Sequence, residues 1–337
     1  MVEPRVVLSL RDLRVTFSGP TTGRPVRAVD GVDLDVMAGE VVALVGESGC
    51  GKTTLVRAVV GLEPIASGTI VVDGATVGRR QSQLRRLRRR VQMIFQDPSG
   101  ALNPRRTVFD AVAEGLRIHR VRGDESTLVG EALSAAGLRP AARYVDRYPH
   151  ELSGGQRQRV LIAGAMALQP TLLLADEPVA SLDASIRGEI LAVMRRFVDE
   201  SGVSIVAVTH DLGLAWNIAD RVAVMYLGRI VEIGPTEQVL SAPRHPYTRA
   251  LLSVVPEIVA HARVDAPAPQ ILTGETPDPT AIPAGCRFHP RCPVVASGDA
   301  DRLGIGDRCR GTDGGAIDVK LVAVGPTHQA ACYAIES

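Results

Sequence analysis

The feature that most constrains this chain is a glycine-rich segment, residues 46–53, with the sequence GESGCGKT. A short, largely apolar run at residues 40–45 precedes it, and a stretch with helical spacing follows it. A strand, a loop and a helix in this order are the setting in which GxxxxGK followed by serine or threonine binds phosphate groups. The alternative, an ordinary glycine turn with a chance lysine, is disfavoured by the complete pattern. The segment therefore predicts an α/β fold of the phosphate-loop NTPase type.

The residue types of this loop suit a nucleoside triphosphate. Gly46, Gly49 and Gly51 allow the backbone to wrap phosphate oxygens and to aim its N–H groups inward. Lys52 supplies a point charge to the β- and γ-phosphates, and the Thr53 hydroxyl is placed to coordinate Mg²⁺. The N-terminus of the following helix adds a favourable dipole. The predicted nucleotide-binding residues of the loop are Gly46, Glu47, Ser48, Gly49, Cys50, Gly51, Lys52, Thr53 and Thr54.

Two carboxylates end a second apolar run, at residues 171–177. Asp176 is expected to hold Mg²⁺, as the acid after the second strand does in phosphate-loop NTPases. Glu177 is one residue further on, so we expect its side chain to point elsewhere, towards an attacking water. It is the candidate general base, a role typically worth about 10²–10⁴ in rate. A solvated acidic pair is the alternative, and a phosphate loop in the same chain disfavours it.

Two more polar residues follow strand-like runs. His210 ends the run at residues 204–209, and Gln96 ends the run at residues 91–95. Open α/β sheets bind ligands at the carboxyl ends of their strands, so we expect His210 to contact the γ-phosphate. Gln96 is a candidate contact for Mg²⁺ or the attacking water, although spacing alone leaves its role open.

A second potential anion site lies about a hundred residues after the first, at LSGGQ, residues 152–156. Ser153 is a natural N-cap for the helical run that follows, and Gly154 and Gly155 bare the backbone N–H groups. Phosphoryl transfer needs positive charge at the γ-phosphate, and no arginine finger is visible near the first loop. We therefore predict that Ser153, Gly154, Gly155 and Gln156 contact a nucleotide held by another subunit; a plain capped helix is the alternative.

The order of these motifs resembles the ATP-binding subunits of ABC transporters over roughly residues 6–234. In that family's terms the motifs are Walker A (46–53), the Q-loop Gln96, the signature (152–156), Walker B (172–176), the base Glu177, the D-loop (181–183) and the switch His210. The resemblance implies head-to-tail dimers that sandwich two ATP molecules between phosphate loops and opposing signatures. It also implies a helical subdomain at about residues 101–168 that contacts a permease, and it makes Phe17 a candidate for stacking on adenine.

The chain resembles the oligopeptide, dipeptide and nickel importer branch more closely. The shared motifs are FQDP (95–98), LNPR (102–105), YPHE (148–151), HPYTRALL (245–252) and GCRFHPRCP (285–293). The resemblance implies ATP hydrolysis that powers uptake of di- or oligopeptides, with nickel or another small solute as the alternative. It implies as partners a second ATPase subunit, commonly a paralogue, two transmembrane permeases and an extracytoplasmic solute-binding protein. The expected location is the cytoplasmic face of the cell membrane.

Composition narrows the remaining choices. The chain has 337 residues, 45% of them apolar, and a formal net charge of +1, which argues against a nucleic-acid binder. The main rival function is a soluble ABC ATPase acting on nucleic acid or ribosomes, but such proteins usually carry two nucleotide-binding halves and this chain has one. No run approaches the ~18–20 apolar residues that span a bilayer. We expect a nucleotide-binding domain at residues 1–234 and an accessory region at 235–337. Within the accessory region, proline-rich stretches at 266–269 and 276–279 are expected to form an extended linker that leads to a small cysteine-bearing module.

Four of the five cysteines lie in the last fifth of the chain. Disulfides are not expected in a reducing cytosol, and four thiolates suit zinc or an iron–sulfur cluster. The spacings lack the short C-x₂-C hairpins of zinc ribbons. The resembling branch includes members with a 4Fe–4S site in this tail, so the resemblance favours a cluster over zinc or no metal. The predicted ligands are Cys286, Cys292, Cys309 and Cys332.

Overall fold

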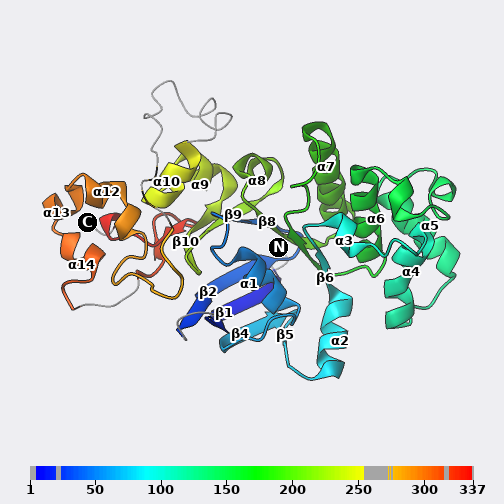
Figure 1. Ribbon diagram of the computed structural model, residues 1–337, viewed down its shortest axis with the longest axis horizontal. Helices are drawn as coiled ribbons and strands as arrows, with labels where there is room; N and C mark the ends of the chain where they lie inside the picture. Colours follow the sequence, from blue (N-terminus) through cyan, green and yellow to red (C-terminus); the bar gives the residue numbers. More distant parts are fainter. Residues whose placement is uncertain are drawn as a thin grey trace.

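The computed structural model describes residues 5–19, 24–253, 272, 274, 276–314 and 319–335. At its centre lies an eight-stranded sheet in the order β11-β12-β10-β9-β3-β8-β7-β6 (Figure 1). The strands from β9 to β6 pair in parallel, whereas β10, β12 and β11 extend one edge with antiparallel pairs. The strands are β3 (Val41–Val45), β6 (Val91–Ile94), β7 (Leu172–Asp176), β8 (Ser204–Thr209), β9 (Arg221–Tyr226), β10 (Arg229–Pro235), β11 (Val322–Ala323) and β12 (Gln329–Ala330).

The central strands are apolar along their whole length because both faces of the sheet are covered. Every residue of β3, β7 and β8 is buried. Successive side chains point to opposite faces. In β7, Leu172 and Leu174 join one hydrophobic cluster, whereas Leu173 and Ala175 join another on the opposite face. This is the pattern expected of a parallel sheet between two layers, and it confirms the predicted strands.

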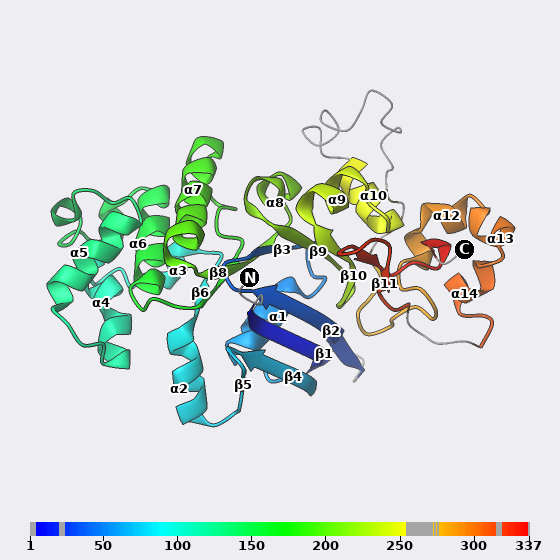
Figure 2. The ribbon, with the colours of Figure 1, turned by 180° about the vertical axis from the view of Figure 1, so that it is seen from behind.

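A second, antiparallel sheet covers one face, with helix α1 (Lys52–Val59) packed against it. Its strand order is β2-β1-β4-β5. Figure 2 shows this sheet on one side of the central strands and helices α7 to α10 on the other. The strands of the second sheet are β1 (Val6–Ser18), β2 (Pro25–Met37), β4 (Ser67–Val72) and β5 (Ala75–Thr76). The helices of the opposite layer are α7 (Ala184–Ser201), α8 (Leu212–Ile218), α9 (Thr236–Ser241) and α10 (Pro246–Ser253).

A group of helices lies at one end of the molecule, in the part of the chain expected to be helical (Figure 1). Its members pack on α6, which carries the predicted signature at its start. Helix α2, which is rich in arginine and precedes β6, buries only Leu87, so most of its surface is exposed to solvent. These helices are α2 (Gln81–Arg90), α3 (Pro98–Ala101), α4 (Val108–His119), α5 (Glu125–Ala135) and α6 (Gly154–Met166), with 3₁₀ turns η1 (Ala141–Arg143) and η2 (Pro149–Glu151).

The cysteine-bearing segment forms a group of short helices at the opposite end (Figure 1). The chain then returns to the main sheet, where β12 pairs with β10, a strand addition that the sequence did not suggest. Of the two predicted linkers, residues 266–269 lie outside the described part of the chain, whereas Pro279 accepts a backbone hydrogen bond from Arg27. The elements of this group are η3 (His289–Arg291), α12 (Pro293–Ala296), α13 (Asp299–Arg302), α14 (Gly306–Arg310) and η4 (Tyr333–Ile335). Within the described ranges, no helix has the length and apolar character needed to cross a bilayer.

Candidate nucleotide site and cysteine-lined cavity

The glycine-rich loop curves tightly between β3 and α1, and two of its glycines are required by their surroundings. Gly46 and Gly51 have φ angles of +152° and +109°, which other residues rarely adopt. A Cβ on Gly46 would lie 2.2 Å from the carbonyl oxygen of Met225, and one on Gly51 would lie 2.0 Å from that of Ala28. The loop therefore packs directly against neighbouring backbone, which fixes its path around the predicted phosphate position.

Lys52 lies at the start of α1 and is 6% exposed. Its Nζ donates hydrogen bonds to the carbonyl oxygens of Gly46 and Glu47, both at 2.8 Å. The ammonium group is thus held inside the curve of the loop. Burial raises the pKa of the nearby Cys50 thiol, so at neutral pH Cys50 is a small neutral side chain filling space in the loop.

Two of the residues predicted to hold Mg²⁺ meet where the start of α1 lies beside the end of β7. Thr53 Oγ1 donates a hydrogen bond of 2.9 Å to Asp176 Oδ1. Asp176 is 1% exposed, and its burial raises the pKa of the carboxyl group although the Thr53 bond opposes this. A hydroxyl beside a carboxylate fits Mg²⁺, which binds a few protein oxygens and keeps several waters.

The three predicted catalytic side chains lie together: His210 and Gln96 each approach the carboxylate of Glu177. His210 Nδ1 lies 3.0 Å from Glu177 Oε1, and Gln96 Nε2 lies 3.5 Å from Glu177 Oε2. Glu177 has a φ of +47°, and its N–H donates to the Val208 carbonyl at 2.9 Å, which ties it to β8. The Glu177 side chain is 17% exposed and that of His210 is 63% exposed. The group therefore sits at the sheet edge, open to solvent on the side of His210.

The predicted signature has the capped-helix geometry expected from its sequence. Ser153 Oγ accepts a hydrogen bond of 3.3 Å from the Gln156 N–H, and Gln156 Oε1 accepts one of 3.0 Å from the Ser153 N–H. This reciprocal pair is a capping box. Figures 1 and 2 show α6 among the helices at one end of the molecule, apart from α1. The phosphate loop and the predicted signature of one chain therefore lie apart from each other.

Two families match this chain. One, described as ABC transporter, matches residues 29–180, and the other, described as oligopeptide/dipeptide transporter, C-terminal region, matches residues 231–298. A probable peptide ABC transporter ATP-binding protein of Sinorhizobium fredii, y4tS, is 43% identical over 289 residues, which cover 85% of this chain and 77% of that protein. The chain belongs to the ATP-binding subunits of the ABC transporter family.

Other relatives of this ABC subunit carry similar names. The di/tripeptide transport ATP-binding protein DppF of Pseudomonas aeruginosa is 43% identical over 300 residues, covering 86% of this chain and 90% of that protein. Among solved structures, CbiO1 of Clostridium perfringens, part of an ABC transporter complex, matches with a TM-score of 0.64 at 27% identity, covering 76% of this chain and 98% of its own. A dimeric ATP-binding cassette, MJ0796, bound to ADP and Pi, matches with a TM-score of 0.62 at 27% identity, covering 68% and 98%. The predicted fold class is confirmed.

Phe17, the predicted adenine contact of this ABC subunit, lies on β1 opposite Val26 of β2. Its ring is half-buried and packs against the hydrophobic cluster that includes α1. The structure thus places Phe17 on the antiparallel sheet beside the phosphate-loop helix. Its stacking role stays a prediction.

Glu47 makes contacts that the sequence analysis missed. Its N–H donates to Tyr247 Oη at 2.9 Å, and its carboxylate accepts bonds from Arg291 at 2.8 and 3.0 Å and from Thr276 at 2.8 Å. Burial works to raise the pKa of Glu47, but these hydrogen bonds and nearby Lys52 outweigh it and leave the pKa below its usual value. The partners lie 200 to 244 residues away in sequence. The sequence offered one hint. Tyr247 and Arg291 lie in the motifs HPYTRALL and GCRFHPRCP, to which the sequence analysis assigned no contact with the nucleotide site.

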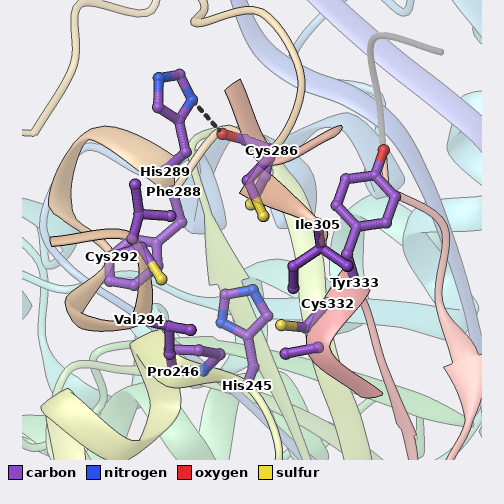
Figure 3. Close-up of a pocket in the computed structure, with 13 residues that line it drawn as sticks. His245, Pro246, Cys286, Phe288, His289, Cys292, Val294, Ile305, Cys332 and Tyr333 are labelled. Carbon is purple, nitrogen blue, oxygen red and sulfur yellow. Dashed lines mark hydrogen bonds between the residues drawn. The ribbon is translucent and has the colours of Figure 1, made fainter. Parts of the chain in front are cut away.

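The four C-terminal cysteines of this ABC subunit line a single cavity of about 20 Å³, together with His245, Phe288 and Tyr333 (Figure 3). Burial raises the pKa of every one of these thiols, to about 12 for Cys286 and about 11 for Cys332. They are therefore neutral at physiological pH as the structure stands. The predicted gathering of these cysteines is seen.

A metal-binding geometry is not seen. Within the described ranges, no group of three or more Cys, His, Asp or Glu side chains is arranged to hold a metal ion. A cavity of about 20 Å³ is close to the space that one water needs. The predicted iron–sulfur or zinc site is thus unsupported: the thiols share a cavity, but their sulfur atoms do not close around a common centre.

Proposed function

We propose that this ABC subunit hydrolyses ATP to power the import of peptides by a membrane complex. The observation that carries this proposal is identity of 40 to 43% over some 86% of the chain to proteins named as peptide, di/tripeptide or oligopeptide transport ATP-binding proteins. The match of residues 231–298 to the C-terminal region of oligopeptide/dipeptide transporters supports the same cargo class. The proposed division is a nucleotide-binding domain at residues 1–234 and an accessory region at 235–337.

In the proposed reaction, the loop N–H groups and Lys52 bind the β- and γ-phosphates. Thr53 and Asp176 would hold Mg²⁺, with Gln96 near it, and a bound ion would supply positive charge that neutralises the phosphates. Glu177 accepts a proton from the water whose oxygen attacks the γ-phosphorus, as the bond to the ADP oxygen breaks. His210, 3.0 Å from Glu177, holds that carboxylate in place and faces the γ-phosphate.

We propose that the second half of each site comes from another ATPase subunit, either a paralogue or a second copy. Ser153 is exposed and caps a helix whose N-terminus is available for an anion. Gly154, Gly155 and Gln156 would then meet the nucleotide held on the neighbour's phosphate loop. The fold match to a cassette that is dimeric when bound to ADP and Pi supports this arrangement.

The proposed complex also contains two permeases and an extracytoplasmic solute-binding protein, so this ABC subunit would lie on the cytoplasmic face of the membrane. A groove of about 440 Å³ beside Gln96 offers a place for a permease segment. Its lining includes Phe95 and Ile118, large apolar side chains that are 40% and 53% exposed. Contiguous exposed apolar surface marks protein contacts, whereas single exposed apolar side chains are ordinary, so the support comes from the groove as a whole.

We keep the four-cysteine metal site as a proposal, with an iron–sulfur cluster preferred over zinc. The support is that Cys286, Cys292, Cys309 and Cys332 line one cavity; binding would require that cavity to widen and the thiols to lose their protons. Protein purified without oxygen should contain iron and acid-labile sulfide, or zinc, and a Cys309→Ser, Cys332→Ser variant should lose it. Cys50→Ser, outside the cavity, should retain it. Wild-type protein free of both metals would contradict the proposal.

Transport measurements test the cargo. Cells lacking this subunit should lose uptake of labelled di- and oligopeptides, and the Glu177→Gln variant should fail to restore it while the wild-type chain succeeds. If such cells lost nickel uptake and kept peptide uptake, the cargo would be nickel and not peptides. If the subunit co-purified with ribosomal RNA and not with permeases, the proposed transport function would be wrong and a function on nucleic acid or ribosomes would be favoured.

A further inference from the structure

Glu47 of the phosphate loop contacts the C-terminal region at three points. Tyr247 Oη accepts from its N–H, and Arg291 and Thr276 donate to its carboxylate. The carbonyl oxygen of the same residue accepts from Lys52 Nζ at 2.8 Å. Glu47 is therefore the link between the C-terminal region and the lysine that is to bind the phosphates.

The contact from Arg291 is the strongest of the three. Its two terminal nitrogens bind the two oxygens of Glu47, at 2.8 and 3.0 Å, in the paired geometry that a guanidinium and a carboxylate favour. The side chains of Arg291 and Glu47 are 8% and 24% exposed. Because the pair is mostly withdrawn from water, loss of one partner leaves an uncompensated charge beside the loop.

The arginine is held in place by the segment that carries it. Phe288, 1% exposed, packs its ring against Tyr226 and Tyr247 at centroid separations of 5.2 and 5.4 Å. Arg287 binds Asp30 at 2.5 Å and the carbonyl oxygen of Leu227 at 2.7 Å. The aromatic cluster therefore joins the Tyr247 helix and the Arg291 turn into one support behind Glu47.

We propose that Arg291 and Tyr247 are positioning residues for ATP binding: they fix Glu47, and through its carbonyl oxygen they fix Lys52 and the curve of the phosphate loop. The inference rests on the proposed role of this loop in binding ATP. It assigns the C-terminal region a task within the nucleotide site, beyond any task in cargo import. Both residues contact Glu47, whereas Glu177, the proposed base, is contacted by Gln96 and His210, so we expect Arg291 and Tyr247 to act on binding and not on the chemical step.

The test is the effect of Arg291→Gln, Tyr247→Phe and Glu47→Gln on KM and kcat for ATP, measured with the full ATPase assembly. We expect Arg291→Gln to raise KM by about tenfold and to change kcat by less than about twofold, on the scale of a buried charged pair. Tyr247→Phe, which removes one oxygen and keeps the ring, should raise KM less. The Glu47→Gln, Arg291→Gln double variant should be no worse than the more affected single variant, because both changes break the same contact.

Two arginines of the same region provide matched controls. Arg302→Gln and Arg310→Gln break surface pairs with Asp299 and Asp301 and leave the support behind Glu47 intact. A positioning role predicts that both variants keep KM within about twofold. Unchanged KM in Arg291→Gln and Tyr247→Phe, or an equal rise in Arg302→Gln and Arg310→Gln, would overturn the inference. Lys52→Ala separates the two proposals: if it leaves ATP binding intact, the proposed nucleotide role of the loop fails instead.

Discussion

The nucleotide site and the cysteine-lined cavity both gather side chains from distant parts of this ABC subunit, but on different supports. Asp176 and His210 lie at or just beyond the ends of β7 and β8, and Lys52 begins α1 after the loop that follows β3; every residue of these three strands is buried. Cys292 and Cys309 lie on a turn and in α14, a helix of five residues. Ladders of backbone hydrogen bonds fix strand ends relative to one another, so polar groups there meet in the absence of ligand. Short helices lack that constraint, so a bound group or docking contacts must supply the final geometry.

The largest expected effect tests whether Glu177, the carboxylate that already contacts Gln96 and His210, is the general base. Glu177→Gln should lower ATP hydrolysis by about 10²–10⁴, because the amide cannot take the proton of the attacking water. ATP should still bind, since the phosphate loop is untouched. Phosphate release from the purified ATPase assembly measures the rate, and Glu200→Gln, an exposed change at the end of α7, is the matched control. Hydrolysis at the normal rate in Glu177→Gln would exclude Glu177 as the base.

A second variant tests whether docking contacts stabilise the C-terminal region. Asp30→Asn leaves Arg287 buried without its charge partner and should cost about 3 kcal/mol in the free energy of unfolding at pH 7. Burial works to raise the pKa of Asp30, but Arg287 and Arg14 outweigh it and lower that pKa. The pair therefore stabilises the fold above about pH 4, the unfolded pKa, and this contribution is lost as the pH falls through the folded value.

Denaturant unfolding at pH 7 and at pH 3 measures this contribution. The difference between wild type and Asp30→Asn should shrink at the lower pH. Asp301→Asn, which breaks an exposed pair in the same region, should change stability by less than about 1 kcal/mol. Equal losses in the two variants would mean that the buried pair contributes no more than a surface one.

Two glycine substitutions compare the cost of a positive φ alone with the cost of a positive φ plus a steric clash. Gly51→Ala adds a Cβ 2.0 Å from the Ala28 carbonyl oxygen. Gly39 also has a positive φ, +70°, but a Cβ added there would meet open space. Gly39→Ala should therefore cost only about 1–2 kcal/mol of backbone strain, with ATP affinity unchanged. Gly51→Ala must also displace the loop and should weaken ATP binding by more than about tenfold. Nucleotide titration of both variants checks this, and equal affinities would show that the loop tolerates the shift.

Much of the nucleotide site followed from the sequence because its residues end buried strands. The run at residues 172–176 is apolar throughout, so its burial and the position of Asp176 at the sheet edge could be read from the pattern. The Glu47 contacts could not, because Arg291 lies 244 residues further on and nothing local signals the pairing. The return of β12 to β10 was missed for a similar reason: a two-residue strand has no periodicity to detect. The number of cysteines near the C-terminus predicted that they lie together, and they line one cavity. Their spacing along the chain does not determine whether the four sulfur atoms surround a common centre.

The phosphate loop and the predicted signature occupy separate parts of one chain, and the central proposal is that hydrolysis requires a neighbouring subunit. The most direct measurement is the rate of ATP turnover per subunit across a dilution series of the assembled ATPase pair, with association followed by light scattering. Turnover per subunit should fall in step with the loss of dimers, and Lys52→Ala should abolish it at every concentration. A rate per subunit that stays constant after the subunits have separated would contradict a shared site.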